Sequence, residues 1–163
     1  MKPLRIYSDT SVIGGCLDEE FAEHSRRFIE QVRTGRVVLL ISELLVEELT
    51  DAPAPVRSIL KGIPIGQLET VVIDDEVEAL RDAYLDAGIL ALRWRDDATH
   101  VAAASVVGAD AIVSWNFRHI VRLDLMRRYN DVNRQMGYRH LTIVTPLEVA
   151  YEPNGEEEDE KDI

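Results

Sequence analysis

Three carboxylates, Asp9, Glu48 and Asp97, stand where apolar segments of the chain give way to helices, or within the first turns of those helices. Asp9 follows the apolar run at residues 4–7, and Glu48 lies in the helix expected after the apolar run at residues 37–41. In an open parallel sheet the carboxyl ends of the strands converge on one crevice, where ligands bind. Carboxylates gathered there favour a hard cation such as Mg²⁺, which is typical of phosphate chemistry.

The elements that would bring these carboxylates together alternate between strand and helix. Strands are predicted at residues 4–8, 37–41, 70–73, 111–114 and 141–144. Helices are predicted at residues 21–34, after Ser42, at 56–61, 74–87, 97–107 and 120–136, and a short last helix is expected to begin at Thr145-Pro146. A turn is expected from Asp9 to Gly15. The alternation predicts a three-layer α/β fold, with a central and mostly parallel sheet of four or five strands flanked by helices.

The composition favours one domain of ordinary globular character. The 163 residues predict a domain at residues 1–151, followed by an acidic tail at 152–163 that lacks apolar anchors and is expected to be disordered. The single cysteine, Cys16, excludes an internal disulfide and a thiolate metal cluster. No apolar stretch approaches the ~20 residues of a membrane span, and the start of the chain lacks the pattern of a secretory signal. We therefore expect a cytoplasmic protein without a membrane partner.

The charge is unevenly distributed along the chain. The formal net charge is −12, and half of it lies at residues 152–163, where seven acidic residues and one lysine give −6. At residues 118–140, six arginines and two aspartates give +4. Nucleic-acid binding depends on a local basic face rather than on the total charge. The acidic balance argues against non-specific coating of a duplex, but it leaves room for a specific RNA contact.

Five short motifs follow one another along the chain. They are Asp9-Thr10-Ser11, Ser42 with Glu48 six residues on, Asp97-Ala98-Thr99-His100, Ser114-Trp115-Asn116-Phe117 and Thr145-Pro146-Leu147-Glu148. Together they resemble the PIN domain, a metal-dependent ribonuclease fold with many bacterial toxins of the VapC type. The resemblance covers residues 4 to about 151 and implies that Asp9, Glu48, Asp97 and Asn116 are the catalytic and metal-binding positions.

The resemblance also implies what the protein acts on and binds. With Mg²⁺ or Mn²⁺ as cofactor, such a site cuts single-stranded RNA and leaves a 5′-phosphate and a 3′-hydroxyl. The cation activates a bound water and neutralises charge on the phosphate. A toxin of a type II toxin–antitoxin pair would further bind an antitoxin protein, and PIN domains commonly form homodimers.

Each candidate has an alternative role. Asp9 could instead cap the backbone of a turn, as aspartates often do. In the helix after Ser42, Glu43 and Glu47 compete with Glu48, which is preferred because it lies next to the apolar stripe. Asp96 could be the N-cap of the helix that contains Asp97. For His100, a packed or hydrogen-bonded histidine is favoured over a metal ligand, a proton shuttle or a phosphate contact.

Asn116 departs from the family pattern, in which many members carry an aspartate. An amide can coordinate through its carbonyl oxygen but brings no charge, so a second cation would be held less tightly. Two hypotheses follow: a working nuclease built mainly on one cation, or a catalytically weakened module that binds RNA or a partner. Ser11 and Ser114 would support the site through hydrogen bonds.

Basic and aromatic residues flank the motifs. Candidates for contacts with the RNA backbone are Arg93, Arg95, Arg118, His119 and Arg122, although each could equally be a solvated surface charge. Trp94 and Trp115 could stack on bases, but core packing is favoured for both. Other phosphate-handling and hydrolytic classes fit poorly, because the chain has neither a Walker loop, nor a dinucleotide glycine fingerprint, nor a nucleophile elbow.

Overall fold

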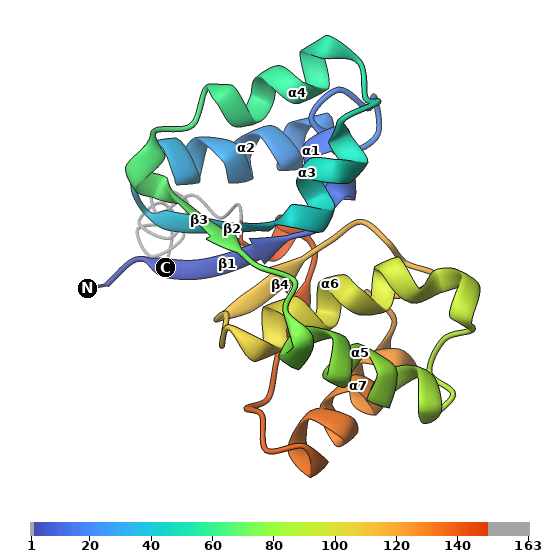
Figure 1. Cartoon of the computed structure of the whole chain (residues 1–163). Coiled ribbons are helices and arrows are strands. Elements are labelled where there is room, and N and C mark those ends of the chain that lie inside the picture. The colour runs from blue at the N-terminus through green and yellow to red at the C-terminus, as the bar shows by residue number, and fades with distance from the viewer. Residues whose placement is uncertain (1, 150–163) are drawn as a thin grey trace, which may run out of the picture.

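A parallel β-sheet runs through the centre of the chain (Figure 1). The computed structural model describes residues 2–149. The sheet consists of β1 Leu4–Ser8, β2 Val37–Ser42, β3 Leu68–Val71, β4 Ala111–Val113 and β5 Thr142–Val144. Its order is β3-β2-β1-β4-β5, and every neighbouring pair is parallel. From β1 the chain moves outward to β3 and then returns to the other side of β1, so the strand order reverses between β1 and β4.

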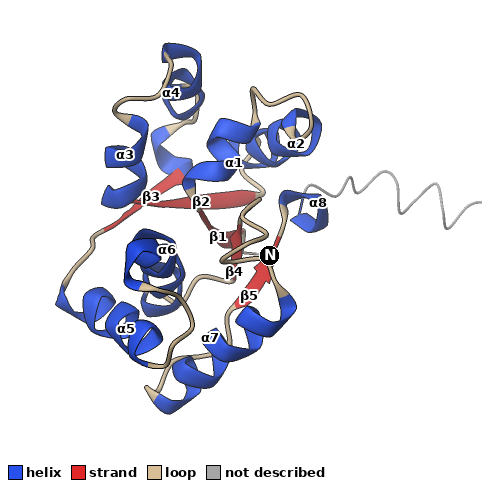
Figure 2. Ribbon diagram, turned by 90° about the vertical axis from the view of Figure 1, so that its right-hand side faces the viewer, coloured by secondary structure: helices blue, strands red, loops and turns tan. Residues whose placement is uncertain are grey.

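Helices cover both faces of this sheet (Figure 2). One layer contains α1 Thr10–Gly15, α2 Ala22–Arg33, α3 Glu43–Leu49 and α4 Ala54–Lys61, with the short α8 Pro146–Val149 against α2. The other contains α5 Asp75–Asp86, α6 Arg95–Val106 and α7 Leu123–Gln135. Two 3-10 turns, η1 Ile65–Gln67 and η2 Leu92–Trp94, precede β3 and α6. The predicted three-layer α/β fold is confirmed.

The strands β2 and β4 are almost entirely apolar because both of their faces are buried. Successive side chains of a strand point to opposite faces. In β2, Leu39 therefore packs with the α1–α4 layer and Leu40 with the α5–α7 layer. In β1, Ile6 and Tyr7 divide between the two cores in the same way. A rigid sheet results, and its carboxyl edge can hold side chains in fixed positions.

Several helix ends follow the predicted capping rules. The Ser42 side chain caps α3 by accepting a hydrogen bond from the N–H of Leu45. Gly35 and Gly88 follow α2 and α5 with φ of 84° and 76°, a left-handed conformation that glycine adopts without a steric penalty. These signals are local, which explains why the sequence alone reveals them.

The turn predicted for the segment from Asp9 to Gly15 is wrong, because all of the segment after Asp9 is helical. Its residues from Thr10 onward form α1, and Val12 and Ile13 are fully buried in the core. Gly15 lets this helix approach its neighbours closely. A Cβ atom at Gly15 would lie 2.7 Å from Ser25 Oγ and 3.0 Å from the Trp115 ring. Packing against the sheet therefore outweighs the turn preference of the two glycines.

Two predicted helix starts are also corrected. Asp96 and Asp97 lie inside the first turn of α6 rather than at its cap, because the η2 turn leads directly into the helix and places Trp94 at the N-cap. The helix predicted from residue 120 begins at Leu123, because residues 115–122 form a loop organised by Asn116. Both differences fall beside the candidate site.

The described part of the chain contains no helix that is both long and apolar enough to cross a membrane. The predicted acidic tail at 152–163 lies outside the described residues.

Candidate active site

Two of the predicted carboxylates and Asn116 follow three adjacent strands, and the third carboxylate, Asp97, comes from a helix start. Asp9 comes directly after β1, Glu48 lies near the end of α3, which follows β2, and Asn116 lies in the loop after β4. Asp97 comes from the first turn of α6 and is close enough for its charge to affect Asp9. The four positions therefore share the carboxyl edge of the sheet, at the point where the strand order reverses.

Asp9 is a buried carboxylate held by two hydroxyl groups. It is 4% exposed. Ser11 Oγ donates to its Oδ1 and Ser114 Oγ to its Oδ2, each at 2.6 Å. Its side chain makes no capping hydrogen bond to the α1 backbone, so the alternative role as a turn cap is wrong. Burial raises the pKa of Asp9 and the charge of Asp97 adds to this effect, while His100 and the two serine bonds oppose it.

Glu48 is the glutamate of α3 that faces this site. Its Oε1 accepts hydrogen bonds from Thr10 Oγ1 at 3.0 Å and from His100 Nε2 at 2.6 Å. Glu43 is directed elsewhere, because it accepts the N–H of Ile73 beyond β3. Burial acts to raise the pKa of Glu48, but the hydrogen bond and charge of His100, together with Thr10, outweigh it and lower that pKa. Glu48 is therefore ionised at neutral pH.

His100 belongs to a buried hydrogen-bonded chain that sequence reasoning did not identify. Its Nδ1 lies 2.7 Å from the hydroxyl of Tyr7, which in turn lies 2.8 Å from Ser42 Oγ. His100 is 2% exposed and Tyr7 is fully buried. The favoured role of His100 as a hydrogen-bonded histidine describes this arrangement. The chain fixes both the ring of His100 and, through it, the carboxylate of Glu48.

Asp97 is held by a second histidine. His119 Nδ1 lies 2.7 Å from Asp97 Oδ2, and the His119 ring packs on Trp94 with a centroid distance of 4.5 Å. The guanidinium groups of Arg93 and Arg118 lie 5.4 and 5.7 Å from the centre of the Trp94 ring. Sequence reasoning considered His119 as a contact with the RNA backbone or as a solvated surface charge, and not as a partner of Asp97. The sequence signal that could have drawn attention to His119 is its spacing. It lies three residues after Asn116, the distance at which an asparagine side chain accepts a backbone N–H.

Asn116 shapes the loop that carries His119. Its Oδ1 accepts the backbone N–H of Arg118 at 3.2 Å and that of His119 at 2.9 Å. Its own N–H donates to Ser114 Oγ at 2.9 Å, and Ser114 in turn donates to Asp9. Asn116 is thus connected to both sides of the site, and its amide oxygen already has two donors.

The two tryptophans have different surroundings. Trp115 Nε1 donates to Ser25 Oγ at 2.8 Å, and its ring stacks on Phe21 with a centroid distance of 4.5 Å. These contacts support the packing role for Trp115. Trp94 instead lies beside the Asp97–His119 pair.

The arrangement offers oxygen donors directed by neighbouring side chains. Within residues 2–149, no hydrogen bond or ion pair engages Glu48 Oε2 or Asp97 Oδ1, although the other oxygen of each carboxylate is bound to a histidine. Anchoring one oxygen while leaving the other open is how supporting residues orient metal ligands. Over the same residues, no three His, Cys, Asp or Glu side chains are already grouped as a metal site. The donor chemistry fits a hard cation, but the side chains would have to close around it.

The fold resembles that of a chain in a solved structure of VapBC2. A chain of VapBC2 from Rickettsia felis, in a crystal structure with a DNA fragment from the VapBC2 promoter, matches this chain with a TM-score of 0.54 and 13% identity. The match covers 86% of this chain and 97% of that chain. At this identity the similarity concerns the fold alone. No family model matches the chain. No curated protein matches it significantly.

Proposed function

We propose that this protein is a metal-dependent ribonuclease of the PIN type that cuts single-stranded RNA. The observation that carries the proposal is the buried Asp9, whose described side-chain partners are serine hydroxyls and which lies within reach of the charge of Asp97. Buried charges in proteins are normally paired or coordinate a metal. None of the described residues forms an ion pair with Asp9, so a cation at this site would stabilise it.

The proposed ligands of Mg²⁺ or Mn²⁺ are Asp9, Glu48, Asp97 and Asn116. When bound, the cation would supply charge neutralisation for a phosphate group and activation of a water. His100 and His119 hold Glu48 and Asp97 in place through one oxygen each. Trp94, Arg93 and Arg118 stand beside the Asp97–His119 pair, where they would contact the RNA.

A specific observation favours a second candidate, a PIN-like module that binds RNA or a partner without efficient cleavage. Asn116 brings no charge, and its amide oxygen already accepts two backbone N–H groups. If those bonds persist, this residue contributes little to a cation. The two functions differ in chemistry and not in binding, so an activity measurement separates them.

The test is cleavage of a single-stranded RNA by the full-length protein with Mn²⁺. Asp9→Asn is expected to abolish cleavage. Glu30→Gln is the matched control, because it removes an exposed carboxylate on α2 whose pair with Arg33 contributes little to stability. Equal behaviour of wild type and Asp9→Asn over a series of metals would reject the nuclease. Calorimetric titration with Mn²⁺ then distinguishes loss of metal binding from loss of chemistry.

We extend the proposal to a toxin of the VapC type with an antitoxin partner, supported by the fold similarity to a chain of VapBC2. Expression of the wild type is expected to arrest bacterial growth, and expression of Asp9→Asn is not. Co-expression of the antitoxin, which we expect to be encoded next to this protein, should relieve the arrest. The proposed homodimer is tested by light scattering of the purified protein.

A further inference from the structure

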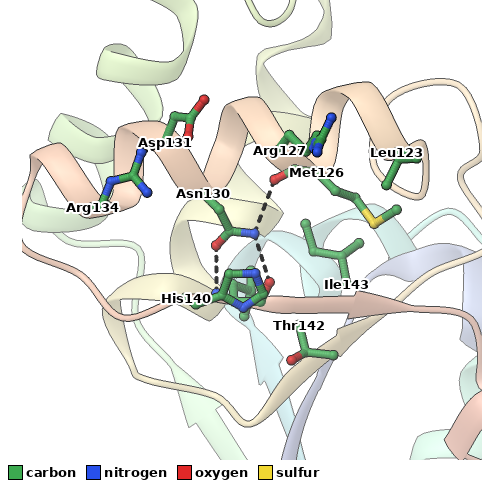
Figure 3. A pocket seen from close by; sticks show the side chains of 10 residues that line it. Leu123, Met126, Arg127, Asn130, Asp131, Arg134, His140, Thr142 and Ile143 are labelled. Carbon is green, nitrogen blue, oxygen red and sulfur yellow. Dashed lines mark hydrogen bonds and ion pairs between the residues drawn. The ribbon is translucent and has the colours of Figure 1, made fainter.

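A basic groove lies between α7 and the edge strand β5 (Figure 3). Its volume is about 660 Å³. Arg127, Arg134 and the acidic Asp131 line it from α7, and His140 lines it from the segment before β5. Leu123, Met126 and Ile143 supply its apolar surface. The groove therefore combines positive charge with a hydrophobic lining.

Asn130 spans the groove and limits what can occupy it. Its Nδ2 donates to the carbonyl of Leu141 at 3.0 Å, and its Oδ1 accepts the N–H of Leu141 at 2.7 Å (Figure 3). The Asn130 side chain thus already bonds the N–H and C=O of Leu141, and a peptide strand added at this edge would need these backbone groups for pairing. A ligand recognised by its charges fits better here than a strand paired through its backbone.

The basic side chains suit a linear polyanion. Arg127 and Arg134 are seven residues apart, which is two helical turns or about 10 Å along one face of α7. Among residues 2–149, neither Arg127 nor the His140 side chain has an ion-pair or hydrogen-bond partner. Arg134 pairs with Asp131 at 3.0 Å, but both side chains are well exposed, so the pair is weak and exchangeable.

The groove begins at the end of α7 that follows the loop of the candidate active site. The loop that carries Asn116, Arg118 and His119 leads directly into α7, whose first residue, Leu123, lines the groove. Arg118 lies over Trp94 at the site end of this path. We propose that the α7–β5 groove binds the sugar–phosphate backbone of a single-stranded RNA that passes through the candidate active site. This inference rests on the proposed nuclease function, because that function supplies the polyanion.

Binding without cleavage tests the groove separately from the chemistry. The probe is a fluorescein-labelled oligouridylate of about 12 nucleotides, a length typical of single-strand sites. Anisotropy is measured with the full-length protein in EDTA. The variant Arg127→Gln/Arg134→Gln is expected to bind about tenfold more weakly at low salt, with a salt slope lower by about 1.4, since each lost phosphate contact contributes ~0.7.

The control variant Arg57→Gln/Lys61→Gln removes the same charge from exposed positions of α4, in the opposite helical layer. It is expected to change the affinity by less than about twofold. An oligomer of about four nucleotides, too short to span site and groove, should bind wild type and groove variant alike. Equal affinity of the groove and control variants for the longer oligomer would overturn the proposal.

The outcomes distinguish the groove from the nuclease. Cleavage by wild type, together with unchanged binding by the groove variant, rejects the groove and leaves the nuclease. Groove-dependent binding without cleavage at any metal concentration rejects the nuclease and leaves the groove as a polyanion site. If a peptide with the sequence of residues 152–163 binds in a groove-dependent way and the oligouridylate does not, the occupant is an acidic peptide and the RNA proposal fails.

Discussion

The proton shared by His100 and Glu48 belongs to the histidine. His100 Nε2 lies 2.6 Å from Glu48 Oε1, and the lowered pKa of Glu48 keeps its carboxylate ionised and therefore able only to accept. On the other side of the ring, Nδ1 meets the hydroxyl of Tyr7, which stays protonated because burial raises its pKa. Tyr7 and Glu48 thus hold the imidazole at both nitrogens, and the imidazole holds one oxygen of Glu48.

Tyr7→Phe is expected to destabilise the protein by about 1–3 kcal/mol, because it leaves His100 Nδ1 without a buried partner and removes one of the two hydrogen bonds of Ser42 Oγ. Urea unfolding measures the loss. The matched control is Tyr138→Phe, which removes a hydroxyl bonded to the exposed Glu76 and should cost less than about 1 kcal/mol. Similar losses for both variants would show that the Tyr7–His100 contact does not order the site.

The sequence alone predicted those features of the fold and of the site that depend on residues close together in the chain. Apolar runs gave the strands, and the position of Asp9 after the first strand gave the edge at which the site lies. The pairings could not be predicted in the same way. Asp97 and His119 are 22 residues apart, and Tyr7 and His100 are 93 apart, so their contact depends on how β1, β4 and α6 pack. Asn116 was identified as a departure, but its role as a loop cap needed the geometry of residues 116–119.

Asp9→Asn is expected to remove activity and to stabilise the metal-free protein by about 0.5–2 kcal/mol, as is common for strained functional groups. The folded-state pKa of Asp9 is raised, so ionised Asp9 lowers stability as pH rises through that pKa. The gain should therefore be largest at pH 8 and shrink as pH falls through the folded-state pKa toward the ordinary value of 3.8.

Thermal unfolding of wild type and Asp9→Asn over that pH range measures the effect. With Mn²⁺ added, the wild type should gain stability and the variant should not, since only binding to the folded state shifts the equilibrium. A variant that is less stable than wild type at pH 8 would show that Asp9 has a purely structural role.

Glu48→Gln is expected to show the opposite pH dependence. The folded-state pKa of Glu48 is lowered from its ordinary value of 4.5, so its contribution to stability is present above that pH and is lost as pH falls through the folded-state pKa. Its side chain is 34% exposed, so solvent screening keeps the contribution below about 1 kcal/mol. Urea unfolding at pH 7 and pH 3 measures it. A difference between wild type and variant that persists at pH 3 would assign the effect to packing rather than to charge.

Asn116→Asp is expected to tighten Mn²⁺ binding by about 3–10-fold, because added ligand charge raises the affinity of an oxygen site for a hard cation. The loop should survive the change, since a carboxylate oxygen accepts the N–H groups of Arg118 and His119 as the amide oxygen does. Without metal, repulsion from Asp9 and Asp97 should lower the stability of the variant, and saturating Mn²⁺ should restore it. Gln135→Glu adds the same charge at an exposed position of α7 and should leave metal affinity unchanged. Calorimetric titration compares the variants, and equal Mn²⁺ affinity of Asn116→Asp and wild type would remove residue 116 from the ligand set and strengthen its assignment as a loop cap.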